Sequence, residues 1–156
     1  MNSMKPRKLL LMAGLHFVIM YVLMYAMVAT IDHVHLNINK GYMAAIMTAP
    51  MLMLEIWLMG EMYADKRALK WITALSAVAL VAAFAFIRQQ TFVSDQPFLR
   101  SMIPHHSSAI LMCNQADLED QEIIELCDDI VQTQEEEIAI MERILDRLNE
   151  AESQAS

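Results

Sequence analysis

The chain has 156 residues, of which 56% are hydrophobic and 15 are methionine, and its formal net charge is −8. This apolar composition, with only 3 glycines and 4 prolines, is not that of an ordinary soluble domain. It indicates helices that are partly embedded in a membrane. Residues 1–94 carry 8 Lys or Arg and 4 Asp or Glu, whereas residues 95–156 carry 3 Lys or Arg and 15 Asp or Glu. Because the chain has no long basic stripe, we expect no nucleic-acid partner.

Three apolar runs in the first half predict three transmembrane helices, over about 9–30, 42–59 and 71–87. At 1.5 Å of rise per residue, the first run is long enough to cross a hydrocarbon core of about 30 Å, and the other two are at the short end of the spanning range. A cleaved signal peptide is the alternative for the first run. Its apolar region is longer than about 15 residues, however, and no small-x-small cleavage motif follows it. We therefore expect an uncleaved anchor and a membrane domain over residues 1–88.

The distribution of basic residues predicts the orientation in the membrane. They cluster before the first run and between the second and third, whereas the loop between the first two runs has only Lys40. The clustered residues are Lys5, Arg7, Lys8, Lys66, Arg67 and Lys70. By the positive-inside rule, the N-terminus is cytoplasmic in a multi-pass inner (plasma) membrane protein. Three spans then place the chain after Arg88 in the periplasm or its equivalent, beyond a linker over 89–94.

The acidic second half predicts an antiparallel helical hairpin over 95–150, followed by a tail over 151–156. The first helix is expected from Asp95, which can cap it, to about Ala116, with a kink or a fresh start at Pro104 because proline lacks the backbone donor. Residues 117–120 form a polar turn, and Asp120 is a good N-cap for the next helix. Apolar residues at spacings of three and four then predict one amphipathic helix to about Asn149. Its acidic face is expected to be solvated.

The stretch FLRSMIPHHSSAILMCNQ concentrates residues that can bind a metal ion. On one face of the first helix, spacings of three and one bring together Met102, His105, His106, Ala109, Met112 and Cys113. The matching face of the second helix carries Cys127, Gln134 and Met141, with Glu137 beside them. In an antiparallel hairpin, Met102 and the two histidines should face Met141, and Cys113 should approach Cys127.

Thioether sulfur and imidazole nitrogen suit Cu(I) and are poor ligands for Mg²⁺ or Ca²⁺. Methionine also needs no deprotonation and forms no disulfide, which makes it useful outside the cytoplasm. Cu(I) is therefore the favoured metal, with zinc or silver as alternatives. A carboxylate-bridged di-iron site is excluded because the sequence contains no Glu-x-x-His pair.

Two further pairs leave alternatives open. Cys113 and Cys127 have helix phases that allow a disulfide, but they also fit additional Cu(I) thiolates or small buried side chains, and we favour the unpaired form. His33 and His35 follow Asp32 on the predicted outer loop. They either pass a metal ion toward the hairpin or are two exposed histidines at the membrane surface.

The pattern Met102-x-x-His105-His106-x-x-Ala109-x-x-Met112, followed by Gln134-x-x-Glu137-Ile138-x-x-Met141, resembles the family of domain of unknown function 305. The resemblance covers about Asp95 to Leu148. It implies a ferritin-like, all-helical fold associated with copper binding and copper tolerance. It also implies Met102, His105, His106, Met112 and Met141 as metal ligands, with Gln134 and Glu137 in support; Cys113 and Cys127 are not part of the pattern.

Family members with a full bundle supply two hairpins, whereas this chain supplies one. Two helices cannot bury an apolar stripe against each other alone, so we expect a homodimer or a larger homo-oligomer that closes a four-helix bundle.

These features predict a membrane-anchored, extracytoplasmic protein that captures or buffers Cu(I) in copper homeostasis, in contact with copper-handling proteins. One alternative is an oligomeric membrane scaffold with no metal role, and another is a thiol or copper redox protein. We expect no enzyme, because the sequence contains no Cys-x-x-Cys motif, nucleophile elbow or phosphate loop.

Overall fold

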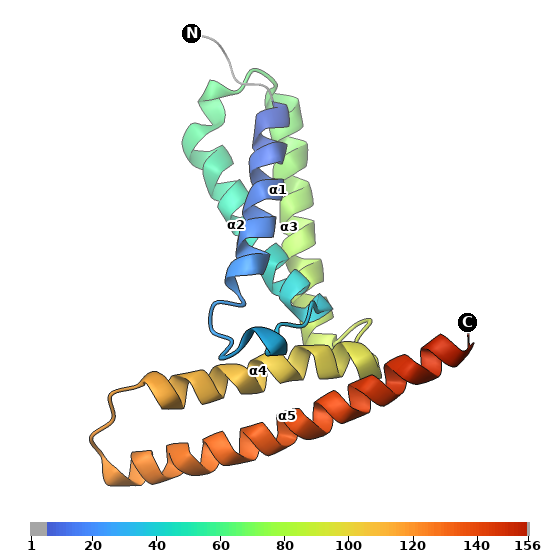
Figure 1. Cartoon of the computed structure of the whole chain (residues 1–156). Helices are drawn as coiled ribbons and strands as arrows, with labels where there is room; N and C mark the ends of the chain where they lie inside the picture. The colour runs from blue at the N-terminus through green and yellow to red at the C-terminus, as the bar shows by residue number, and fades with distance from the viewer. Residues whose placement is uncertain (1–5, 156) are drawn as a thin grey trace. The chain divides into compact units, whose positions relative to one another are not determined.

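The computed structural model describes residues 6–155, and within them it contains helices and no β-strand (Figure 1). The α-helices are α1 (Pro6–Leu23), α2 (Ile38–Met59), α3 (Lys66–Gln89), α4 (Asp95–Gln115) and α5 (Gln121–Ala155). Two short 3-10 helices, η1 (Ile31–His33) and η2 (Gly60–Met62), precede and follow α2. The predicted all-α fold class is confirmed.

The chain forms two compact units. The membrane unit contains the residues up to Met24 together with Asn39–Thr91, and the hairpin unit contains Tyr25–Ile38 together with the residues from Phe92 onward. The boundary differs from the one drawn on the sequence, because the loop between the first two apolar runs belongs to the hairpin unit. The hairpin is therefore built from two separate stretches of chain.

Three helices of the membrane unit are long and apolar enough to cross a membrane, namely Pro6–Leu23, Ile38–Met62 and Lys66–Gln89. Many of their apolar side chains are exposed, among them Leu11 at 74% and Leu75 at 70%, as expected for helices whose surroundings are lipid. The first helix is shorter than its apolar run, because it ends at Leu23 instead of about Thr30. Beyond this end, the Tyr25 hydroxyl donates to the His35 carbonyl at 2.7 Å and closes a loop.

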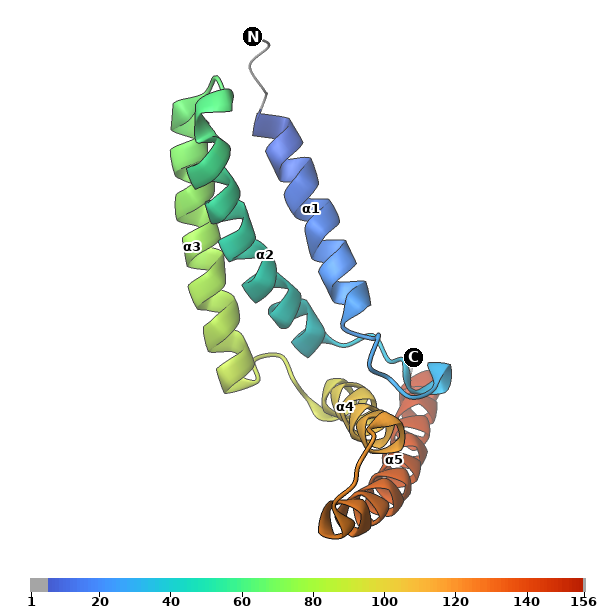
Figure 2. The ribbon, with the colours of Figure 1, turned by 90° about the vertical axis from the view of Figure 1, so that its left-hand side faces the viewer.

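The core of the membrane unit lies where α1 starts, α2 ends and α3 starts. Leu9, Leu52, Tyr63 and Leu69 form a buried cluster there. The Asp65 carboxylate accepts from the Ala68 N–H at 2.9 Å and caps α3. Figure 2 shows the turn that joins the end of α2 to the start of α3 at this end.

In the hairpin unit, α4 and α5 run antiparallel (Figure 1) and enclose a core of Leu99, Ile103, Ile110, Ile138 and Leu145. The predicted N-cap of α5 is confirmed, since the Asp120 carboxylate accepts from the N–H groups of Glu122 and Ile123 at 3.0 and 3.2 Å. The N-cap of α4 is Ser94 instead of Asp95. Helix α5 continues to Ala155, through most of the stretch expected to be a tail.

Helix α4 continues through Pro104, so the predicted fresh start at this residue is wrong. Proline removes the N–H that would bond to the carbonyl four residues earlier, which is that of Arg100. The side-chain amide of Asn37, from the loop before α2, donates to this carbonyl at 3.3 Å. A residue 63 positions away thus satisfies the group that the proline leaves open.

Candidate metal site

His106 is the polar residue at the centre of the hairpin. It occupies the packing face of α4 with Leu99, Ile103 and Ile110, at steps of three and four, and is 9% exposed. Its Nδ1 lies 3.0 Å from the Met102 carbonyl, and its Nε2 lies 2.7 Å from a carboxylate oxygen of Glu137 on α5. Because a carbonyl can only accept, Nδ1 donates to it, and Nε2 is directed at the carboxylate.

This orientation matches the way in which proteins prepare a histidine for a metal ion. A ligating histidine usually donates its other ring N–H to a carbonyl or carboxylate, which fixes the tautomer and the direction of the free nitrogen. The Met102 carbonyl does this for His106. Glu137, predicted only as a supporting residue, is the direct partner of Nε2 and is half-exposed.

The sequence placed both histidines and Met112 on the packing side of α4, but of the three only His106 is buried. His105 is exposed, with its ring centroid 5.9 Å from that of His106, and Met112 is 58% exposed. Burying Ile103 and Ile110 removes more apolar surface from water than burying histidine or a helix-terminal methionine, so the isoleucines take the core positions. A single chain therefore buries His106 and leaves His105 and Met112 at the surface.

Met102 and Met141 are half-buried. Met102 precedes His106 by one turn on α4, and Met141 follows Glu137 by one turn on α5. Because the helices are antiparallel, the two methionines lie toward the same end of the His106–Glu137 pair, and Met141 packs against the hairpin core. Gln134, one turn before Ile138, is also half-buried.

The two cysteines form a disulfide near the tip of the hairpin, with their Cα atoms 5.3 Å apart. The prediction that Cys113 approaches Cys127 is confirmed, and the preference for unpaired cysteines is wrong. The antiparallel register that pairs His106 with Glu137 also brings the cysteines within bridging distance. Bonded sulfur provides no thiolate, so the structure does not support these cysteines as Cu(I) ligands.

His33 and His35 lie in the loop that packs on the hairpin. His33 Nδ1 is 2.9 Å from the Ser107 hydroxyl, within hydrogen-bonding distance, and this hydroxyl also accepts from the Ala29 N–H at 2.9 Å. The opposite ring nitrogen of His33 is 3.9 Å from a carboxylate oxygen of Glu142. In this structure, His33 attaches the loop to α4 and α5.

His35 carries a buried Nε2 that has no hydrogen-bond partner among the described residues. Burial lowers the pKa of His35 below its ordinary value. Among the nearby charges, Glu142 and Asp146 act to raise this pKa, whereas Arg100 and His33 act to lower it. Burial therefore favours the neutral form of this ring.

The attached loop gives the hairpin two different sides. We call the side with Ser107 and Glu142, which contacts the loop, the docked side. A helix turns by about 100° per residue, so His105 lies roughly 160° around α4 from Ser107, and Glu137 roughly 140° around α5 from Glu142. Two rows at steps of three, four or seven follow this second, open side: Phe98, Met102, His105, Ala109 and Met112 on α4, and Ile123, Leu126, Ile130, Glu137 and Ile140 on α5.

The open side combines metal donors with exposed apolar side chains. Phe98, Met112, Leu126 and Ile140 are between 46% and 58% exposed. Among residues 6–155, no group of three or more His, Cys, Asp or Glu side chains is arranged to hold a metal ion. The histidine and carboxylate side chains of one hairpin therefore do not form a metal site by themselves within these residues.

Sequence reasoning missed Ser107, which is fully buried, and Asn37, which is 7% exposed. Their roles depend on contacts between segments more than 60 residues apart. Pro104 was the available signal, since a proline inside a helix leaves a carbonyl that needs a donor from elsewhere.

Comparisons with known proteins place these features in a family. The family model described as domain of unknown function (DUF305) matches residues 81–156. "Uncharacterized protein L153" of Acanthamoeba polyphaga mimivirus is 34% identical over 119 residues, which is 75% of this chain and 76% of that protein. This similarity extends beyond the hairpin into the membrane unit. No solved structure matches the chain.

Proposed function

Because the chain belongs to the DUF305 family, as its motif predicted, we propose that it is a membrane-anchored Cu(I)-binding protein. The hairpin unit captures or buffers copper outside the cytoplasm, and the three candidate spans hold it at the inner membrane. The positive-inside rule favours this orientation, with the N-terminus in the cytoplasm and the hairpin unit outside it. Passing copper to or from other copper-handling proteins follows from such a position.

The observation that carries the proposal is the His106–Glu137 pair at 2.7 Å, oriented by the Met102 carbonyl. Nε2 of His106 would bind the copper ion, and the methionines next to the pair would supply soft sulfur. The preference for Cu(I) rests on these thioether and imidazole donors. Zn²⁺ and Ag(I) are the comparison metals, since Ag(I) shares the softness of Cu(I) and Zn²⁺ does not.

A second copy of the chain completes the site in this proposal. Two open sides facing each other bury the exposed apolar residues of both hairpins and add a second His105, His106 and Met112, as in a four-helix bundle. Residues 95–156 carry 15 acidic and 3 basic residues, so two hairpins repel each other. A bound cation beside the two Glu137 carboxylates offsets part of this repulsion.

The test is a competition titration on the full-length protein in detergent, because a fragment that starts after α3 lacks the loop of the hairpin unit. Cu(I), maintained by ascorbate, is titrated against a chelator of known affinity. We expect a tight site in the native protein, loss of that site in the His105→Ala/His106→Ala variant, and retention in the matched control His33→Ala. For Glu137→Gln we expect an affinity lower by about 10- to 100-fold, the usual effect of losing a carboxylate beside a metal-binding histidine.

Absence of tight Cu(I) binding in the native protein, or binding unchanged in the double histidine variant, would contradict the proposal. A dimer that forms without any copper affinity would favour the scaffold alternative. Stronger binding of Zn²⁺ than of Cu(I) or Ag(I) would contradict the role of the methionines.

A further inference from the structure

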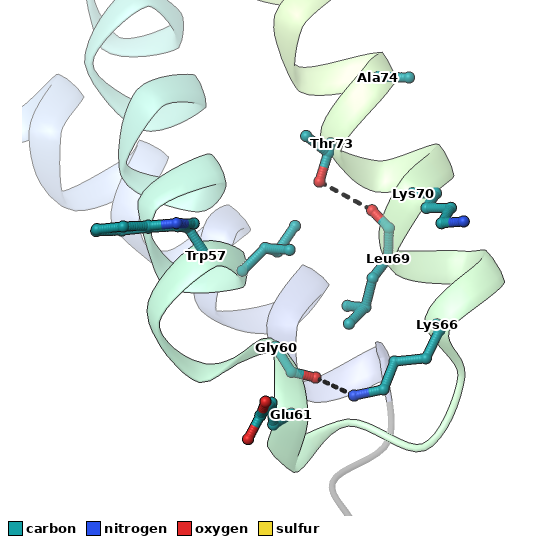
Figure 3. Close-up of a pocket in the computed structure, with 9 residues that line it drawn as sticks. Trp57, Gly60, Glu61, Lys66, Leu69, Lys70, Thr73 and Ala74 are labelled. Atoms are coloured by element: carbon teal, nitrogen blue, oxygen red, sulfur yellow. Dashed lines mark hydrogen bonds between the residues drawn. The ribbon is translucent and has the colours of Figure 1, made fainter.

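A groove lies between the end of α2 and the start of α3 in the membrane unit (Figure 3), with a volume of about 570 Å³. Its apolar lining includes Ile56, Leu69 and Ala74, and its polar lining includes Glu61, Lys66 and Lys70. The groove is distant in sequence from every residue assigned above to the metal site. It is therefore separate from that site.

The polarity of the groove changes along the helices. Lys66 and Glu61 lie at the turn where α2 and α3 meet, and Lys70 lies one turn further along α3. Deeper still, Thr73 directs its hydroxyl to the Leu69 carbonyl at 3.0 Å and so presents little free polarity to the groove (Figure 3). A ligand that matches this gradient has a charged end and a long apolar end.

The groove lies where a membrane surface is expected, because it opens between the ends of two candidate spans. Trp57 lines it and is 79% exposed. Tryptophan concentrates at the level of lipid headgroups, where its ring is partly in the apolar phase and its N–H is hydrated. Lysine likewise lays its methylene stem along apolar surface and directs its ammonium to the headgroups.

The charges at this end favour an anionic headgroup. Lys66 uses one of its three N–H donors on the Gly60 carbonyl, at 2.7 Å, which leaves two. Across the described part of the chain, the salt bridges involve histidines and neither Lys66 nor Lys70. Arg7, Lys8 and Arg67 lie at the same end of the unit, and the carboxylate of Asp65 is used as the helix cap.

We propose that this groove binds one anionic glycerophospholipid. The lipid phosphate lies between Lys66 and Lys70, an acyl chain follows Ile56 and Leu69, and the exposed Trp57 ring, on the outer side of α2 (Figure 3), contacts the surrounding lipid at the same level. Glu61 accepts from a headgroup hydroxyl, which favours phosphatidylglycerol over a headgroup with no hydroxyl. The bound lipid fixes the α2–α3 turn at the membrane surface.

The test uses the fluorescence of Trp57 in the full-length protein, with Trp71→Phe to remove the other tryptophan. The protein is reconstituted in phosphatidylcholine vesicles that contain a small fraction of lipid with brominated acyl chains, which quench tryptophan on contact. We expect brominated phosphatidylglycerol to quench Trp57 more strongly than brominated phosphatidylcholine at the same mole fraction. Lys70→Gln should reduce this preference by about fivefold, which is the usual contribution of one basic residue to binding at an anionic lipid surface.

The matched control is Arg67→Gln, which removes the same charge from a neighbouring position that does not line the groove. It should leave most of the preference in place. Equal quenching by the two lipids in the parent protein overturns the proposal. An equal loss of the lipid preference in the Lys70 and Arg67 variants also overturns it, because the preference then comes from the overall surface charge and not from the groove. Relief of quenching by soluble glycerol phosphate also overturns it, because a headgroup alone then suffices.

Discussion

The docked side and the open side of the α4–α5 hairpin have opposite relations to the rest of the chain. On the docked side, Ser107 and the Arg100 carbonyl are both occupied by the loop that precedes α2. On the open side, His105 and Met112 are exposed next to the buried His106. One side of the hairpin is thus covered by its own chain, whereas the other side is uncovered and, in the proposed function, receives a second copy.

The largest effect is expected from the disulfide, which joins α4 to α5 near the tip of the hairpin. Cys113 and Cys127 are 14 residues apart, and closing a loop of that length stabilises a protein by about 3 kcal/mol. Cys113→Ser/Cys127→Ser should lower the free energy of unfolding by that order, as measured by chemical denaturation in detergent. Cu(I), kept reduced by ascorbate, should still bind the folded variant, because the proposed site does not use the cysteines.

A smaller effect is expected from breaking the docked side at Asn37. Asn37→Ala leaves the Arg100 carbonyl without its donor, which costs about 1–3 kcal/mol. Hydrogen exchange of the α4 amides around Pro104 should become faster. The second change Pro104→Ala supplies a backbone N–H to the same carbonyl, so it should restore protection in the Asn37→Ala background.

Asn39→Ala is the matched control, because the Asn39 amide donates to Gln90 in the membrane unit. Faster exchange in α4 of this control, or no rescue by Pro104→Ala, would contradict the role given to Asn37.

The smallest effect is a pH dependence of the docked side. Burial lowers the pKa of His35 below its ordinary value of 6.5, so the unfolded ring takes up a proton at a higher pH than the folded ring. The stabilisation is complete above that ordinary value and is lost as the pH falls below it. In the metal-free protein, hydrogen exchange of the loop around His35 should therefore be faster at about pH 5.5 than at pH 7.5, after correction for intrinsic rates.

His35→Leu should remove this pH dependence, because leucine does not titrate. An unchanged pH dependence in that variant would assign the effect to another group, such as Glu142 or Asp146.

The helices and the register of the hairpin could be predicted from the sequence because they follow from local periodicity. Asp120, with its short polar side chain before an amphipathic run, indicated the start of α5, and the antiparallel order brought Cys113 near Cys127. The course of the loop could not be predicted. Its docking depends on the single carbonyl that Pro104 leaves open, and no local pattern identifies Asn37 as the distant donor.

For the candidate site, the sequence supplied the residues proposed as donors, and it indicated their geometry only in part. Met102, His105 and His106 share one half of the helix, but which of them is buried depends on competition with Ile103 and Ile110 for the core. Spacing alone does not decide that competition. It also gave no indication that Glu137 would be the direct partner of His106.

The central claim is that the open side is half of a copper site that a second copy completes. Native mass spectrometry of the full-length protein, released from detergent with and without Cu(I), tests it most directly. The account predicts that copper is carried by the two-chain species and that adding copper increases the share of that species. If single chains bind copper as tightly as the two-chain species does, the claim is contradicted.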